Sequence, residues 1–293
     1  MPELPEVETV RRGLQPVLEG RRIVRLEQRR ANLRFPFSPD FAERVAGQTV
    51  TSLARRAKYL LADMTGDEVL VMHLGMSGSF RIDAPQGTDN PGNFHHERAK
   101  LSQHDHVVFH IEDGSTITYN DPRRFGFMLL IPRAELADHA LFGKMGIEPL
   151  GNALTPQYLA GKFSGRTTSL KAALLDQRNV VGLGNIYVAE ALWRAGLSPK
   201  RSAGSLVTRT GRPGKHLEPL IQTIRAVLHE AIEAGGSSLR DHAQTDGSLG
   251  YFQHRFSVYD REHVACSRPG CAGTIEKFTQ NGRSTYWCPA CQR

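Results

Sequence analysis

Apolar and polar residues alternate along much of the first 132 residues, which is typical of strands buried on one face. The strand-like segments are 23–29, 49–64, 69–73 and 107–111. Ahead of them, Val7, Val10 and Leu14 recur at helical spacing. The pattern therefore predicts one helix followed by a mostly antiparallel β-sandwich that ends near residue 132.

Helical spacing replaces this alternation after Pro132. The expected helices are 154–163, 170–176, 186–195 and 217–232. The stretch Gly182-Leu183-Gly184-Asn185 directly precedes the third of them, and its two glycines permit a tight turn. The free N–H groups at a helix start can bind a phosphate. We therefore expect a helix–two-turns–helix arrangement that clamps a DNA backbone.

Two polar segments interrupt the helical half. Residues 202–215 are rich in Gly, Ser, Thr and Arg, which predicts a surface loop. Residues 235–250 form a second long polar loop, and loops of this length are either disordered or functional lids.

All four cysteines lie near the end of the chain, at Cys266, Cys271, Cys288 and Cys291. Their spacing is C-x4-C, sixteen residues, then C-x2-C. Paired thiolates at such spacings supply the four ligands of a tetrahedral structural zinc ion. Between the pairs, Asn281-Gly282 is a type I′ hairpin signal. We expect a C-terminal four-cysteine zinc β-hairpin, with Arg283 projecting from its tip.

The chain has 293 residues and a formal net charge of +7, so it is long enough for two or more domains and is basic. Such a charge suits a polyanionic partner, although many proteins carry this balance on solvated faces. No apolar run approaches the length of a membrane span, and we expect no signal peptide. Clustered cysteines in a metal site indicate a reducing compartment, with the cytoplasm as the expected location.

The first residues, Met1-Pro2-Glu3-Leu4-Pro5, suggest covalent chemistry. A small second residue favours removal of Met1, which would leave the secondary amine of Pro2 at the terminus. An α-amino group has a reference pKa of about 7.7–8.0, so a nucleophilic fraction is present near neutrality. Glu3 could then shuttle protons. The alternative is structural, because proline and acidic residues also suit the first turn of a helix.

Three polar motifs in the strand-rich half each allow two interpretations. Lys58, beside Tyr59, suits a phosphate contact or a solvated strand face. Met76, in a glycine-bounded turn, suits a wedge in a base stack or simple core packing. For the His104-Asp105-His106 triplet we favour a phosphate contact over a metal site, because two histidines on one strand face cannot complete a site alone.

A fourth motif, Asp121-Pro122-Arg123-Arg124-Phe125-Gly126, breaks the strand pattern with a loop. Arg123 and Arg124 suit a base edge or a phosphate, and Phe125 suits stacking between bases. The alternative is an arginine salt bridge and a core phenylalanine.

Taken together, these motifs resemble the bacterial formamidopyrimidine-DNA glycosylase family, and the similarity runs from Met1 to Gln292. The stretches that carry it are 2–8, 55–61, 73–79, 121–126, 180–187, 235–252 and the cysteine-rich tail. The resemblance implies an α+β multidomain fold. Its expected parts are a catalytic β-sandwich domain at 1–132, a helical DNA-binding domain at 133–262 and a zinc hairpin at 263–293.

The resemblance also implies a base-excision repair enzyme that acts on double-stranded DNA containing oxidised purines, as a monomer with one structural zinc ion. Pro2 would attack C1′ of the damaged nucleotide, and Glu3 would protonate and position the sugar. Loss of the base would leave a Schiff base, and β- and δ-elimination would nick the strand. A flipped nucleotide is required, since C1′ is inaccessible inside the stack.

The remaining site residues take their implied roles from the same family. Lys58, Asn185 and Arg283 resemble its phosphate clamp, with Arg283 as proton donor at δ-elimination. His104 and Arg124 are further candidates for DNA contacts, and Lys171 matches a lysine near the lesion. Met76, Arg123 and Phe125 resemble the trio that fills the void left by the flipped base, with Arg123 facing the orphaned cytosine. The loop after Gly235 resembles the cap over that base.

Departures from the family are small. The first cysteine pair is C-x4-C where C-x2-C is commoner, and the segments 83–100 and 202–215 are longer than in many members. The rival interpretations are an endonuclease VIII-type enzyme for oxidised pyrimidines and a non-catalytic DNA-binding relative. A zinc-dependent hydrolase is disfavoured because four cysteines leave zinc no open position.

Overall fold

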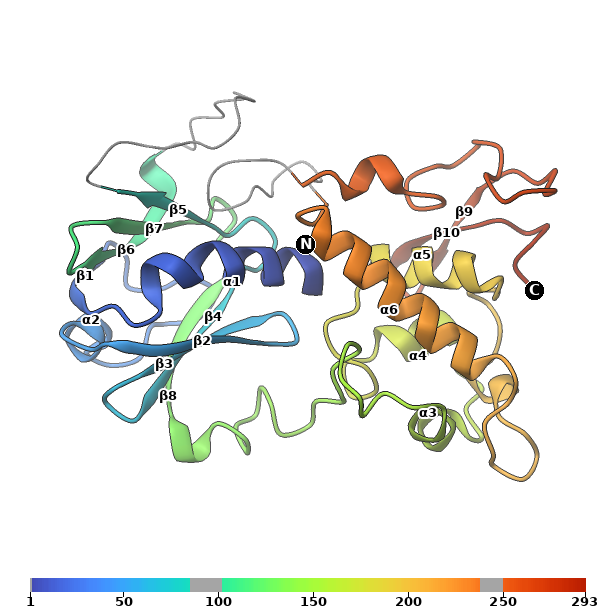
Figure 1. Ribbon diagram of the computed structural model, residues 1–293, viewed down its shortest axis with the longest axis horizontal. Helices are drawn as coiled ribbons and strands as arrows, with labels where there is room; N and C mark the ends of the chain where they lie inside the picture. Colours follow the sequence, from blue (N-terminus) through green and yellow to red (C-terminus); the bar gives the residue numbers. More distant parts are fainter. Residues whose placement is uncertain (1, 85–101, 238–249) are drawn as a thin grey trace. The chain divides into compact units, whose positions relative to one another are not determined.

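The computed structural model describes residues 2–84, 102–237 and 250–293, and these residues divide into two compact units (Figure 1). The first unit comprises Met1–Gly143 and Ala234–Gln253, and the second comprises Lys144–Glu233 and His254–Arg293. The chain therefore completes the helices of the second unit and returns to the first before forming its C-terminal hairpin. The three-part division expected from the sequence stays a prediction.

The first unit contains eight described strands in two four-stranded antiparallel sheets, ordered β1-β6-β7-β5 and β2-β3-β4-β8. The strands are β1 (Ile23–Gln28), β2 (Val50–Arg56), β3 (Tyr59–Met64), β4 (Glu68–His73), β5 (Ser79–Asp83), β6 (Asp105–Ile111), β7 (Thr116–Asn120) and β8 (Phe127–Pro132). Both sheets contribute to one buried apolar cluster, as the expected β-sandwich requires. The strict alternation of buried and half-buried residues along β3 shows why the sequence pattern was informative.

Helix α1 (Leu4–Leu18) packs beside both sheets through β2, β3 and β5 (Figure 1). Val7, Val10 and Leu14 are fully or almost fully buried, so the helical spacing read from the sequence is the core-facing stripe. Pro2 does not begin the helix, because Glu3 is the N-cap and Pro5 occupies the first turn. A short helix, α2 (Phe41–Val45), covers the β1 side.

The second unit contains the helices α3 (Pro156–Phe163), α4 (Leu170–Leu175), α5 (Asn185–Ala195) and α6 (Leu217–Glu233). Its hairpin consists of β9 (Glu276–Gln280) and β10 (Arg283–Trp287), joined by Asn281 and Gly282 with φ of 51° and 70°. Positive φ at both turn residues is the type I′ geometry that the Asn-Gly pair predicts. The α+β fold class with antiparallel sheets is confirmed, and the hairpin lies where the cysteine spacing indicated.

A buried carboxylate connects α5 to the segment that leads into the hairpin. Glu190 is fully buried, and its Oε1 accepts hydrogen bonds from the backbone N–H groups of Ser257, Val258 and Tyr259 at 3.1, 3.0 and 2.9 Å. Helix α5 also packs against α4, α6 and β10. The glutamate therefore accepts hydrogen bonds from three backbone N–H groups that lie outside any helix or strand.

One sequence expectation about this unit is only partly correct. Residues 202–215 contain a short 3-10 helix, Ala203–Leu206, and both Ala203 and Leu206 are buried. Their apolar side chains anchor a segment whose remaining composition is polar. The longer segment at 83–100 and the polar loop at 235–250 lie largely outside the described residues. Within the described ranges, no helix is long and apolar enough to cross a membrane.

The Glu190 network generates a stability prediction. Glu190→Ala removes the common acceptor of three backbone donors in a fully buried position, and we expect a loss on the order of 3 kcal/mol in the free energy of unfolding. Urea unfolding measures this loss. Glu233→Ala, at the exposed last position of α6, is the matched control and should change stability little. Equal stability of the two variants would show that Glu190 does not organise this segment.

Candidate functional site

The N-terminal residues are held in place by the carboxylate of Glu6. Pro2 and Glu3 are buried, with only 3% of Glu3 exposed. Glu6 Oε2 accepts a hydrogen bond from the backbone N–H of Glu3 at 2.8 Å. Its Oε1 accepts from the backbone N–H and the hydroxyl of Ser237 at 2.8 and 2.9 Å. One side chain thus connects the start of the chain to Ser237, a residue 231 positions away.

Lys58 lies in the tight turn between β2 and β3 and is 8% exposed. The preceding residue, Ala57, has φ of 54°, a left-handed conformation that is strained for alanine. Arg55 donates to the Ala57 carbonyl at 2.8 Å, and Arg55 also pairs with Glu8 of α1 at 3.2 Å. Burial tends to raise the pKa of Glu8, but hydrogen bonds from Arg11 and Arg12 outweigh it and lower that pKa. An ionised Glu8 therefore stabilises the turn that aims Lys58.

Two neighbouring loops carry Met76 and the arginine–phenylalanine motif, and the buried carboxylate of Asp121 joins them. Asp121 Oδ1 accepts from the Ser77 hydroxyl at 2.6 Å, and Oδ2 accepts from the Gly126 backbone at 2.9 Å. The Ser77 oxygen in turn accepts from the Arg123 backbone N–H at 3.1 Å. A Cβ at Gly75 would lie 2.3 Å from the Gly126 nitrogen, so the two backbones touch where only glycine fits.

The outer ends of these loops face solvent. Arg123, Arg124 and Phe125 are exposed, and Met76 is partly exposed. The Arg123 guanidinium lies over the Phe125 ring at 4.9 Å from its centroid. Phe125 is 44% exposed, so it is not the core phenylalanine considered from the sequence, and Arg123 stacks on it without an ion pair to any of the described residues. The structure brings Met76, Arg123 and Phe125 onto one rigid pair of loops.

His73 supports the same loop pair from the end of β4. Its ring stacks on Phe127 at 5.2 Å, and its Nδ1 accepts the Gly75 backbone N–H at 3.0 Å. Burial, followed by the charges of Lys58 and Arg34, lowers the pKa of His73 to about 4. The neutral ring is required for the hydrogen bond, since protonation of Nδ1 would remove the acceptor.

The His104-Asp105-His106 motif has divided roles. His106 is buried and donates to the Asp121 carbonyl at 2.9 Å, whereas His104 is partly exposed, with its ring 6.5 Å from that of His106. In the part of the chain that the structure describes, neither histidine belongs to a group able to hold a metal. The phosphate contact expected of His104 stays a prediction.

In the second unit, Asn185 and Lys171 hold the hairpin backbone next to Arg283. The Asn185 amide and the Lys171 ammonium both donate to the Ser284 carbonyl, at 2.9 and 3.0 Å. Lys171 also donates to the Thr285 hydroxyl at 2.6 Å and is 1% exposed. Asn185 is the first residue of α5, and Arg283 is exposed at the start of β10. Lys171 thus contacts the hairpin from a buried position.

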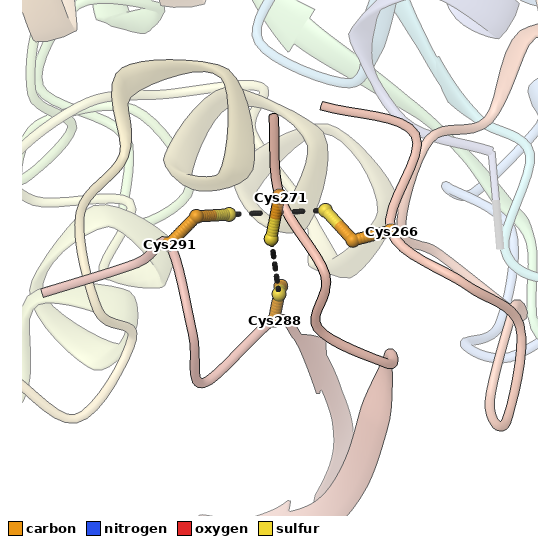
Figure 2. A group of neighbouring side chains, drawn as sticks. All are labelled: Cys266, Cys271, Cys288 and Cys291. Atoms are coloured by element: carbon orange, nitrogen blue, oxygen red, sulfur yellow. Dashed lines mark hydrogen bonds between the residues drawn. The ribbon is translucent and has the colours of Figure 1, made fainter. Parts of the chain in front are cut away.

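The four cysteines converge at the base of the hairpin (Figure 2). Their Sγ atoms all lie within 4.8 Å of one another, and two pairs are separated by 3.8 and 3.6 Å. A tetrahedral zinc ion with Zn–S bonds of 2.3 Å requires sulfur atoms about 3.8 Å apart, so the donor set fits zinc. A Cβ at Gly273 would lie 2.7 Å from Cys288 Sγ, which explains the glycine beside the cluster.

Comparison with known proteins agrees with this geometry. Residues 1–128 match the formamidopyrimidine-DNA glycosylase N-terminal domain, and residues 145–243 match the formamidopyrimidine-DNA glycosylase H2TH domain. A formamidopyrimidine-DNA glycosylase from Bradyrhizobium sp. is 62% identical over 293 residues and covers 100% of both chains. The corresponding protein of Rhizobium meliloti is 60% identical with the same coverage. This chain belongs to the formamidopyrimidine-DNA glycosylase family.

Solved structures of family members share the whole fold. The MutM (Fpg) protein from Thermus thermophilus is 36% identical, with a TM-score of 0.81 over 99% of this chain and 98% of that one. A Lactococcus lactis Fpg mutant, in complex with DNA that contains Fapy-dG, is 33% identical with a TM-score of 0.82 over 100% of both chains.

Sequence reasoning missed the residues that position the site. Glu6, Ser77 and Asp121 act through hydrogen bonds between segments distant in the chain, and His73 stacks on the distant Phe127. Their spacing in the sequence gives no signal of those contacts. The one available clue was the density of glycine and proline around them, which indicates backbone that must be held in unusual conformations.

His73 generates a prediction about pH. Its pKa is about 4 in the folded protein and near 6.5 in an unfolded chain, so the unfolded state takes up a proton first as the pH falls. This group therefore stabilises the fold above pH 6.5 and loses up to about 3 kcal/mol of that contribution between pH 6.5 and 4. Urea unfolding at several pH values across this range measures how steeply the free energy of unfolding changes with pH.

His73→Asn is the informative variant, because its Oδ1 can still accept the Gly75 N–H but cannot titrate. It should flatten the slope between pH 6.5 and 4, whereas His263→Asn, at an exposed site, should not. An unchanged slope in His73→Asn would contradict the assignment.

Proposed function

We propose that this protein is a bifunctional DNA glycosylase and abasic-site lyase of base excision repair that removes oxidised purines, including 8-oxoguanine and formamidopyrimidines. The observation that carries the proposal is the Pro2-Glu3 start, buried and fixed by Glu6, in a chain of the formamidopyrimidine-DNA glycosylase family. The solved complex of the Lactococcus lactis relative with DNA that contains Fapy-dG supports the substrate class.

The chemistry begins at the amine of Pro2, which becomes a free secondary amine once Met1 is removed. Its lone pair forms a bond to C1′ of the flipped nucleotide while the bond from C1′ to the base breaks, and the departing base takes up a proton. Glu3 protonates the sugar ring oxygen, so the ring opens to an iminium. Proton loss from C2′ then expels the 3′ phosphate, and a second elimination expels the 5′ phosphate, with Arg283 as proton donor.

DNA binding follows from cationic and amide groups on both units. Lys58, Asn185 and Arg283 suit phosphate contacts, and His104 and Arg124 add further donors. The hydrogen bond from Arg55 to the Ala57 carbonyl holds the turn that carries Lys58, and the hydrogen bond from Asn185 to the Ser284 carbonyl holds the hairpin next to Arg283. Lys171 is buried, so it contributes to DNA binding by holding the hairpin in place and not by contacting the DNA directly.

Met76, Arg123 and Phe125 suit the gap left in a duplex by a flipped purine. A planar guanidinium can donate two hydrogen bonds to the acceptors on the pairing edge of the orphaned cytosine. Met76 and Phe125 would restore stacking on either side. The hydrogen bonds among Ser77, Asp121 and the Arg123 backbone support this role, because they link the loop that carries Met76 to the loop that carries Arg123 and Phe125.

The zinc ion would be held by Cys266, Cys271, Cys288 and Cys291 and would supply a rigid cross-link at the base of the hairpin. Four thiolates leave no position for a water molecule or substrate, so the ion is structural in this proposal.

The nucleophile is tested by borohydride trapping on DNA that contains 8-oxoguanine. The reduced adduct should map to Pro2, because reduction converts the iminium to a stable amine. A chain with an uncleaved N-terminal extension is the control, and it should not be trapped. Glu3→Gln should lose base excision while DNA binding survives, since it removes a proton donor and no phosphate contact. Trapping of the extended chain, or cleavage of oxidised pyrimidines alone, would exclude the proposal.

Substitution of Arg123 should change which opposite base the enzyme prefers, whereas substitution of Lys58 should weaken DNA binding in general. Arg123→Ala removes the reader of the orphaned base, so discrimination between cytosine and the other three bases should fall by about 1–3 kcal/mol. Lys58→Ala removes a phosphate contact and should weaken binding opposite all four bases while reducing the salt dependence. Excision of 8-oxoguanine opposite each base, at two salt concentrations, measures both. If Arg123→Ala keeps the wild-type ranking of bases, another residue reads the orphaned base.

A further inference from the structure

The first cysteine pair contains two more residues than the commoner C-x2-C spacing, and this longer segment includes Arg268. Arg268 is half-buried, and its Nε donates to Cys291 Sγ at 3.2 Å. The arginine therefore reaches from the first cysteine pair to the second. Neither the spacing of the cysteines nor the phosphate clamp accounts for this contact.

Arg268 also binds the C-terminal end of helix α5. Its Nη2 donates to the Trp193 carbonyl and lies 3.5 Å from the Arg194 carbonyl. The guanidinium stacks on the Trp193 ring, 4.9 Å from the ring centroid. Trp193 is itself tied to the cluster, because its Nε1 donates to Cys266 Sγ at 3.3 Å. Arg268 and Trp193 thus form one stacked pair that donates to a sulfur of each cysteine pair.

The positive charge of Arg268 lies where two negatively charged groups would otherwise repel each other. Four thiolates around one divalent zinc ion carry a formal net charge of about −2. The C-terminus of a helix carries a partial negative charge from its unpaired carbonyl groups. A tetrathiolate centre beside the end of α5 would therefore place two negative regions side by side. The Arg268 guanidinium lies between them and donates to both, which offsets their repulsion.

We propose that Arg268, together with Trp193, is a positioning residue of the metal centre: it neutralises thiolate charge, holds the cluster against the end of α5 and slows loss of the ion. The inference rests on the zinc site of the proposed function. The contact between Arg268 and α5 also affects two residues of the proposed DNA-binding site. Helix α5 begins at Asn185, and the hairpin carries Arg283. Fixing the cluster to one end of α5 helps to fix the spacing between these two groups.

Transfer of zinc to a chelating dye tests the proposal in the full-length protein. Arg268→Met keeps the aliphatic stem but removes the charge and all donors. Loss of a residue that hydrogen-bonds a metal ligand typically weakens metal binding on the order of 10–100-fold, and we expect zinc release to accelerate by a similar factor. Trp193→Phe keeps an aromatic ring for Arg268 but removes the donor to Cys266, and should give a smaller acceleration.

Two further variants separate charge from general disturbance. Arg268→Lys keeps the charge without the planar geometry and should release zinc at an intermediate rate. Arg212→Met, at an exposed position of the same unit, should release zinc at the wild-type rate. Alkylation of the cysteines by iodoacetamide, followed by mass spectrometry, gives a second readout, because cysteines that lose their zinc ion sooner become accessible to the reagent sooner. If Arg268→Met fails to fold, Arg268→Lys and Trp193→Phe decide the outcome.

Wild-type rates of release and alkylation in Arg268→Met and Trp193→Phe would overturn the proposal. A wild-type protein that binds no zinc would overturn both this inference and the structural zinc ion. A zinc-loaded protein that lacks glycosylase activity would overturn the proposed enzyme alone, since zinc release is measured without DNA.

Discussion

Catalysis by a chain terminus requires that the terminus be immobile, although the first residues of most domains are poorly ordered. The carboxylate of Glu6 imposes this constraint. It accepts the backbone N–H of Glu3 on one oxygen and two donors of Ser237 on the other. One buried side chain therefore connects the start of the chain, where the proposed nucleophile Pro2 lies, to Ser237 in the segment by which the chain returns to the first unit.

Polar contacts also hold the backbone around Lys58 and around Arg123. Lys58 depends on the left-handed Ala57, whose carbonyl is held by Arg55. The exposed Arg123 depends on Ser77 and, through it, on the fully buried Asp121. In both cases the backbone that carries a proposed DNA-contacting residue is held by polar contacts to neighbouring segments. Such preorganisation limits the entropy lost when DNA binds.

The sequence was sufficient where the determining interactions are local. The Asn281-Gly282 turn, the cysteine spacing and the helical stripe of α1 each depend on neighbouring residues, and the structure contains all three elements. It was insufficient where distant segments meet. Glu6 and Ser237 are 231 positions apart, and no periodicity indicates their contact. Lys171 shows the intermediate case, because its family match suggested a place near the lesion while its burial against the hairpin required coordinates.

The central claim is that buried contacts hold the terminal amine in its reactive position. The most direct measurement is the single-turnover rate of covalent complex formation by Glu6→Gln on abasic-site DNA, where base release is already complete. A displacement of about 1 Å at a reacting group lowers rates on the order of 100-fold, so a loss of that size is predicted, with DNA affinity and zinc content retained. A wild-type rate in a correctly folded Glu6→Gln protein would contradict the account.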